Sequence, residues 1–168
     1  MNLAMSRSHA WVKRGCELID HVPANWGRKN LTLLGAIRLS GWVVLTTMFD
    51  TTNGERFVEW LRTKLLPKLT RSDVLVMDNL KAHKAPGVAI ACKKAGVRVI
   101  YLPPYSPDFN PIEPAWALQK QHVRKHAPRC PIMLRRIARR ARYRVTPRHC
   151  RGWFAHSGYL VESGDLWD

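Results

Sequence analysis

Acidic side chains are scarce in this sequence and absent from much of its C-terminal half. The 168 residues include 12 Asp and Glu against 28 Lys and Arg, which gives a formal net charge of +16. Between Pro114 and Val161 there is no Asp or Glu at all. A charge surplus of this size repels itself and is tolerated most easily beside a counter-charge. The composition therefore predicts a polyanionic partner, and nucleic acid is the leading candidate.

Cysteines and long apolar runs are also few. The cysteines show neither a C-x-x-C spacing nor the density of a small secreted scaffold, which argues against a disulfide framework. They are Cys16, Cys92, Cys130 and Cys150. No stretch reaches the roughly 18 apolar residues of a membrane span, and MNLAMSRSHAWVKRG lacks the apolar segment of a signal peptide. We expect reduced thiols and a soluble, cytoplasmic protein with no membrane partner.

The pattern of apolar residues predicts an α/β fold with helices packed on a mixed sheet. Residues 31–39 and 42–49, separated by a short polar turn, are predicted to form a tight hairpin. Helical spacing of apolar residues over 53–69 predicts an amphipathic helix. The short apolar runs 73–79 and 97–102 are typical of strands buried on both faces.

Local signals in the sequence predict three further helices. A helix is expected over 85–96, with Gly96 just past its end. Another begins near Glu113 and runs to Lys125. The last covers 131–145, with Pro131 in its first turn and apolar residues on one stripe.

Two acids stand out against this background. Asp78 lies at the C-terminal end of a predicted strand, at the edge where open α/β sheets usually bind ligands, and Glu113 lies 35 positions later. Each has a structural alternative: Asp78 could begin a turn, and Glu113 could form a capping box with Asn110. Carboxylates that converge from different elements are also what divalent ions need in phosphodiester chemistry.

The stretches of sequence around these two acids resemble a known protein family. The stretches VMDNLKAHK and LPPYSPDFNPIE, and the 34 residues between Asp78 and Glu113, resemble the DDE endonuclease domain of mariner-like bacterial insertion-sequence transposases. The segments NLAMSR, VPANWGRKNLTLLGAI and TPRHCRGWFAHSGY are similar to that family too. The resemblance implies an RNase H-like mixed sheet flanked by helices, with Asp78 as the second catalytic acid and Glu113 as the third. It also implies two Mg²⁺ or Mn²⁺ ions and metal-dependent cleavage and strand transfer of DNA.

The same resemblance places the first acid on the central, opening strand, just before the segment that matches NLAMSR. Here that segment begins at Asn2. We therefore expect residues 1–168 to be one N-terminally truncated catalytic domain, without its first strand, its first Asp or the preceding helix-turn-helix region. Such a chain should be marginally stable and should cleave DNA negligibly by itself.

Other residues are candidates for substrate contact. His83 could touch substrate phosphate or a metal-bound water near the two acids, although a polar loop residue is the simpler interpretation. The basic residues of the C-terminal helices are expected to bind the phosphates of double-stranded DNA in a strongly salt-dependent way. They are Lys120, Arg124, Lys125, Arg135, Arg136, Arg139 and Arg140. A homodimer is left open, and a bacterial, nucleoid-associated location follows from the resemblance.

Two rival functions are also compatible with this sequence. One is a non-catalytic, basic DNA-binding protein in which Asp78 and Glu113 are relics of an ancestral transposase. The other is the product of a pseudogene derived from such a transposase.

Overall fold

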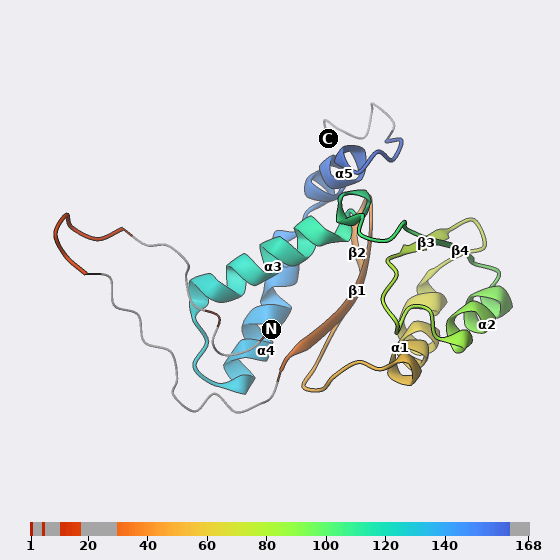
Figure 1. Cartoon of the computed structure of the whole chain (residues 1–168), viewed down its shortest axis with the longest axis horizontal. Helices are drawn as coiled ribbons and strands as arrows, with labels where there is room; N and C mark the ends of the chain where they lie inside the picture. Colours follow the sequence, from red (N-terminus) through yellow and green to blue (C-terminus); the bar gives the residue numbers. More distant parts are fainter. Residues whose placement is uncertain (2–4, 6–10, 18–29, 162–168) are drawn as a thin grey trace.

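A β-hairpin lies at the centre of the molecule, with helices on both sides of it (Figure 1). The computed structural model describes residues 1, 5, 11–17 and 30–161. The hairpin consists of β1 (Thr32–Arg38) and β2 (Gly41–Met48), which are antiparallel, with Arg38 opposite Gly41. Gly41 has a φ of +117°, a backbone angle that residues with a Cβ rarely adopt. This glycine therefore lets the chain reverse between the two strands. The predicted hairpin is confirmed.

The helix predicted over 53–69 is present, but its hydrogen-bond pattern changes along its length. In α1 (Gly54–Trp60), the side chain of Asn53 caps the first turn by accepting a backbone N–H at 2.9 Å. A π-helical turn, η1 (Leu61–Leu65), and a 3-10 turn, η2 (Leu66–Lys68), follow. Pro67 lacks the N–H that an α-helix would use, which accounts for the tighter last turn.

The second sheet pairs β3 (Val74–Met77) with β4 (Arg98–Tyr101) in parallel, and α2 (Pro86–Ala95) joins them. As predicted, α2 ends at Gly96, whose φ is +73°. The prediction that both strands are buried on both faces is wrong, because most of β4 and the first residue of β3 are exposed. Each strand has one partner within the described residues, and the core of α1 and α2 covers only one face of the pair.

The predicted mixed sheet is therefore divided, within the part of the chain that the structure describes, into an antiparallel pair and a parallel pair. A common core still joins them. Phe57, Leu61, Met77 and Val88 form its centre, and Leu34 of the hairpin packs against it. Burial of these side chains, at about 25 cal/mol per Å² of apolar surface, is the main attraction between the two halves.

Two helices confirm the predictions for the C-terminal region. They are α3 (Ile112–His126) and α4 (Pro131–Ala141), and Pro131 occupies the first helical position of α4. The buried stripe of α4 meets Val123 of α3 and Leu31 in a second core. These helices lie on the opposite side of the hairpin from α1 and α2 (Figure 1).

The last helix, α5 (Pro147–His156), was not among the predicted elements. Its start is nevertheless encoded locally: the Thr146 hydroxyl accepts the N–H of His149 at 3.3 Å, and Pro147 is at the first helical position. None of the helices in the described ranges combines the length and apolar character needed to cross a membrane.

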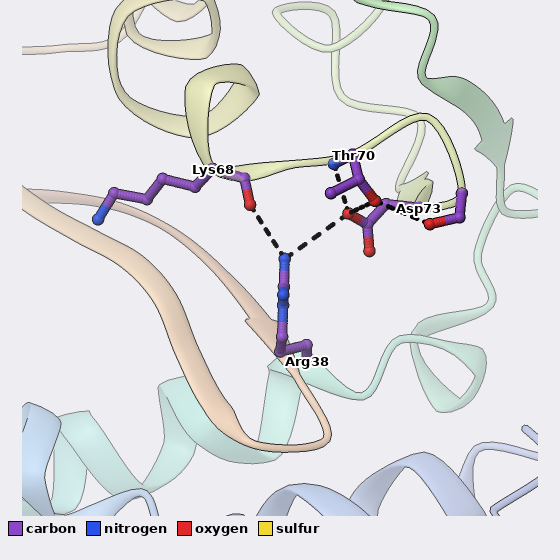
Figure 2. Close-up of polar contacts among 5 residues, drawn as sticks. Arg38, Lys68, Thr70 and Asp73 are labelled. Atoms are coloured by element: carbon purple, nitrogen blue, oxygen red, sulfur yellow. Dashed lines mark hydrogen bonds and ion pairs between the residues drawn. The ribbon is translucent and has the colours of Figure 1, made fainter.

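A polar network joins the end of β1 to the turn before β3 (Figure 2). One guanidinium nitrogen of Arg38 donates to the carbonyl of Lys68 at 3.2 Å and lies 3.8 Å from a carboxylate oxygen of Asp73. That oxygen also accepts the backbone N–H and the hydroxyl of Thr70, at 2.7 and 3.0 Å. The Thr70 N–H, above all, lowers the pKa of Asp73. The network thus connects the two sheets at this end.

Candidate active site

Asp78 begins the loop that follows β3, where the chain leaves the sheet. Its Oδ1 accepts the N–H of Leu80 at 3.0 Å, so the residue does form the turn that its alternative interpretation foresaw. The same oxygen lies 2.6 Å from Nδ1 of His83. Since an ionised carboxylate can only accept, the His83 nitrogen donates. About a third of the Asp78 side chain is exposed, at 36%, so a ligand can reach it.

Glu113 lies in the first turn of α3, and its side chain is exposed. The capping-box alternative is wrong: the N-cap is Pro111, and no side chain caps the helix there. The chain turns into the helix through a backbone bond instead, from the N–H of Glu113 to the carbonyl of Asn110 at 3.1 Å. In the described structure no hydrogen bond or ion pair engages the Glu113 carboxylate, which leaves it available to a ligand and favourably placed near the positive end of the helix dipole.

Hydrogen bonds on both sides of Asp78 tie it to the loop that leads to Glu113. The N–H of Leu102 donates to the carbonyl of Met77 at 2.8 Å, and the side-chain amide of Asn79 donates to the carbonyl of Leu102. The loop from Leu102 onward therefore starts directly beside one acid and ends at the other. Tyr101 adds a bond from its hydroxyl to the carbonyl of His83 at 2.9 Å.

A groove of about 410 Å³ brings the predicted site residues together. Asp78, His83 and Glu113 all line it. Its remaining walls are mainly apolar and come from both sheets, α1, α3 and α5. A more open hollow of about 830 Å³ lies between the starts of α1 and α2, but neither acid lines it. The groove is therefore the better candidate for chemistry.

The donor set suits a hard divalent cation such as Mg²⁺ or Mn²⁺ better than a soft metal that prefers thiolate ligands. Asp78 and Glu113 offer carboxylate oxygens, and Mg²⁺ is often bound by one or two carboxylates with waters completing its shell. No group of three or more His, Cys, Asp or Glu side chains capable of holding a metal occurs among the described residues. The two acids thus fit part of a metal site, and a second ion would need a further carboxylate.

Comparison with known proteins decides the family. Residues 1–134, which include both acids, match the model for the DDE superfamily endonucleases. The chain belongs to this family. No curated protein sequence matches the chain.

Solved structures of Mos1 transposase share the fold of this DDE endonuclease domain. A paired-end complex with the left transposon end has a TM-score of 0.57 at 18% identity, and a strand transfer complex has 0.56 at 17%. A paired-end complex with Mn has a TM-score of 0.50 at 17% identity. Each match covers 94% of this chain and 51 or 52% of the Mos1 chain. The chain therefore spans about half the length of these relatives, and the predicted RNase H-like α/β fold is confirmed.

The predicted basic residues lie on the surface of the DDE endonuclease domain. All of them have exposed side chains: Lys120, Arg124 and Lys125 on α3, and Arg135, Arg136, Arg139 and Arg140 on α4. The opposite stripe of α4 is buried, so its arginines are directed outward by the packing of the helix. The pKa of His122 on α3 is lowered, first by burial and then by His126 and nearby cations. The positive charge of this surface therefore acts on its own side chains as well.

Sequence reasoning missed two residues that shape the site. The Asn79 amide positions the loop beside Asp78, and Asn110 lines the groove next to Glu113. Each stands beside or near an acid that was singled out, but an Asn in a turn is too common to mark a site by itself.

Proposed function

We propose that this chain is the catalytic domain of a mariner-like transposase of a bacterial insertion sequence, which cuts and rejoins double-stranded DNA. The observation that carries the proposal is the convergence of Asp78 and Glu113 on one groove in a fold shared with Mos1 transposase. The two acids come from separate elements, as phosphodiester chemistry with divalent ions requires. The spacing of both acids in the sequence supports the same assignment.

Asp78 and Glu113 would hold the divalent ion, Mg²⁺ or Mn²⁺. When bound, such an ion supplies activation of a hydroxyl nucleophile and stabilisation of the leaving oxygen. The chain's own residues would orient the ligands: the Leu80 N–H and His83 fix one oxygen of Asp78, and the Asn110 carbonyl fixes the first turn that carries Glu113. His83 is best assigned as a residue that orients Asp78, with contact to phosphate as a second role.

We assign the first acid of the family to a further strand between β1 and β3. The walls of the groove include every residue of 33–39 and of 73–78. Successive residues of a strand point to opposite faces, so the groove follows the strand edges rather than one face of a sheet. Met1 already pairs with Leu31, just before β1, through bonds of 2.8 and 2.7 Å. A strand that leads into Met1 would continue along this edge with its acid near Asp78.

The DNA would lie over the exposed basic faces of α3 and α4. These faces combine many cations with no acidic neighbour on the same helices beyond Glu113. Contacts of this kind neutralise phosphates without reading sequence, so binding should depend strongly on salt. The relatives were solved with transposon ends and as paired-end complexes, which favours double-stranded DNA and a homodimer for the complete protein.

The proposal is tested by nicking of supercoiled DNA in the presence of Mg²⁺ or Mn²⁺. We expect negligible cleavage by this chain and measurable cleavage by a fusion that places an apolar strand with one Asp ahead of Met1. The same fusion with Asn in place of that Asp, and the active fusion with Asp78→Asn, should both be inactive. Nicking by the unfused chain that is lost in Asp78→Asn would contradict the need for an acid in addition to Asp78 and Glu113.

The second candidate is a non-catalytic, basic DNA-binding protein. It is favoured by the exposed arginines of α4, which can bind phosphates without any help from the acids. This candidate predicts salt-dependent DNA binding that is unaffected by Asp78→Asn, Glu113→Gln or divalent ions. Cleavage by the Asp-bearing fusion would exclude it.

A further inference from the structure

Tyr105 combines full exposure with an unfavourable backbone conformation. Its relative exposure is 103%, and its φ is +57°, in the left-handed region that residues with bulky side chains rarely adopt. Among the described residues, no hydrogen bond or ring contact involves Tyr105. The folded structure therefore gains nothing visible from the side chain and still maintains its strained backbone.

The other described non-glycine residue with positive φ shows what an ordinary structural reason looks like. Ala127, with φ of +38°, is the C-cap of α3, and its N–H bonds to the carbonyls of Val123 and Arg124. A left-handed residue at this position ends a helix in many proteins. Tyr105 caps nothing, so its conformation needs another explanation, and strain of this kind is concentrated at functional sites.

The position of Tyr105 relates it to the two acids. It lies in the loop between β4 and α3 (Figure 1), three residues after Leu102, so their Cα atoms are at most about 11 Å apart. Leu102 is bonded to the residues on both sides of Asp78. At the other end, the hydroxyl of Tyr159 donates to the carbonyl of Phe109 at 3.0 Å. Prolines at 103, 104 and 107 further restrict the loop.

We propose that Tyr105 stacks on an unpaired DNA base beside the phosphate that Asp78 and Glu113 engage. The proposal rests on the proposed function and adds a substrate contact to it. An aromatic ring on a restrained loop loses little entropy when it stacks, and every base offers a face to it. A base next to a cut phosphate can unpair more easily than one inside an intact duplex, which gives the ring a partner.

The experiment uses two duplexes, one blunt and one with a short single-stranded 3′ end that carries 2-aminopurine. The wild-type chain should quench the 2-aminopurine fluorescence, and Tyr105→Phe should do the same because stacking needs no hydroxyl. Tyr105→Ala should lose the quenching and bind the single-stranded end on the order of tenfold more weakly. Its affinity for the blunt duplex should be unchanged.

Two controls separate this role from simpler ones. Tyr143→Ala removes another exposed tyrosine, 74% exposed, outside this loop, and should keep the quenching; equal loss in both variants would overturn the proposal. Tyr105→Gly should lose the quenching but unfold at no lower urea concentration than wild type, since glycine suits a positive φ. A marked loss of stability in Tyr105→Gly would show a structural role instead.

The outcomes also distinguish a failure of the stacking role of Tyr105 from a failure of the proposed function. DNA binding with quenching that persists in Tyr105→Ala overturns the stacking role and leaves the proposed function intact. Absence of DNA binding by the wild-type chain overturns the proposed function itself.

Discussion

Nδ1 of His83 lies 2.6 Å from Oδ1 of Asp78, and this bond engages one of the two carboxylate oxygens that a cation could use. A donor to a charged group is worth more than an ordinary hydrogen bond, about 1.5–3 kcal/mol. The bond orients Asp78 and at the same time competes with a ligand for it. Which effect is larger can be measured directly.

We predict that His83→Ala tightens Mn²⁺ binding, on the order of tenfold, because it frees Oδ1 from that donor. Titration calorimetry with the His83→Ala, Asp78→Asn and wild-type chains measures this. Asp78→Asn should bind Mn²⁺ much more weakly than either. Weaker binding by His83→Ala would mean that orientation of the carboxylate outweighs competition, as for ligands held by an outer hydrogen bond.

A close approach at Gly35 gives a stability prediction. A Cβ added there would lie 2.7 Å from Cζ3 of Trp42 and 3.0 Å from Cη2 of Trp116. Gly35→Ala should therefore cost about 1–3 kcal/mol by overpacking, seen as a lower midpoint in urea unfolding. Gly152→Ala on α5 meets nothing within 4 Å and should be neutral or slightly stabilising. Equal effects of the two substitutions would contradict the packing around Gly35.

The buried Gln119 links α3 to α4 and gives a second stability prediction. With its amide nitrogen directed at the Ala138 carbonyl, 3.1 Å away, its oxygen accepts the N–H of Arg142 at 3.2 Å. Gln119→Leu leaves both groups without this partner and should cost about 1–3 kcal/mol. Gln121→Leu, at an exposed position of the same helix, is the control and should change the unfolding free energy little.

The buried thiols predict a loss of stability in alkali. Burial raises the pKa of Cys150 from 9.0 to about 11, and burial also raises that of Cys92. The unfolded chain therefore releases these protons at lower pH than the folded chain does. The stabilising contribution is complete below pH 9 and decreases as the pH rises toward 11. Cys150→Ala should flatten the decline of unfolding free energy over that range, and an unchanged decline would argue against it.

The arginines of α4 predict how DNA binding responds to salt. Replacing Arg135, Arg136, Arg139 and Arg140 with Gln should reduce the slope of log K against log salt by about 3–4, if each contacts one phosphate. Fluorescence anisotropy with a labelled duplex measures the slope. The matched control replaces four other exposed cations, Arg62, Lys64, Lys93 and Lys94, and should leave it nearly unchanged. An unchanged slope in the α4 variant would mean that these arginines only solvate their helix.

The sequence by itself determined the elements with strong local signals. The hairpin, α2 with its end at Gly96, α3, and α4 with Pro131 at its start were all predicted, because periodicity, turn residues and caps act within one segment. The family of the chain was also indicated by the stretches around Asp78 and Glu113. Even α5, which was missed, had a local signal in Thr146 and Pro147.

The tertiary structure alone decided what surrounds each element. An apolar run such as 97–102 looks the same whether or not a second layer covers it. The exposure of β4 followed only from the one strand that pairs with it in the described part of the chain and from the one-sided core. The same holds for the freedom of the Glu113 carboxylate and for the bond between Asp78 and His83, which depend on side-chain geometry in the folded loop. Local interactions set the type of each segment, while contacts between segments set burial and the partners of the polar atoms.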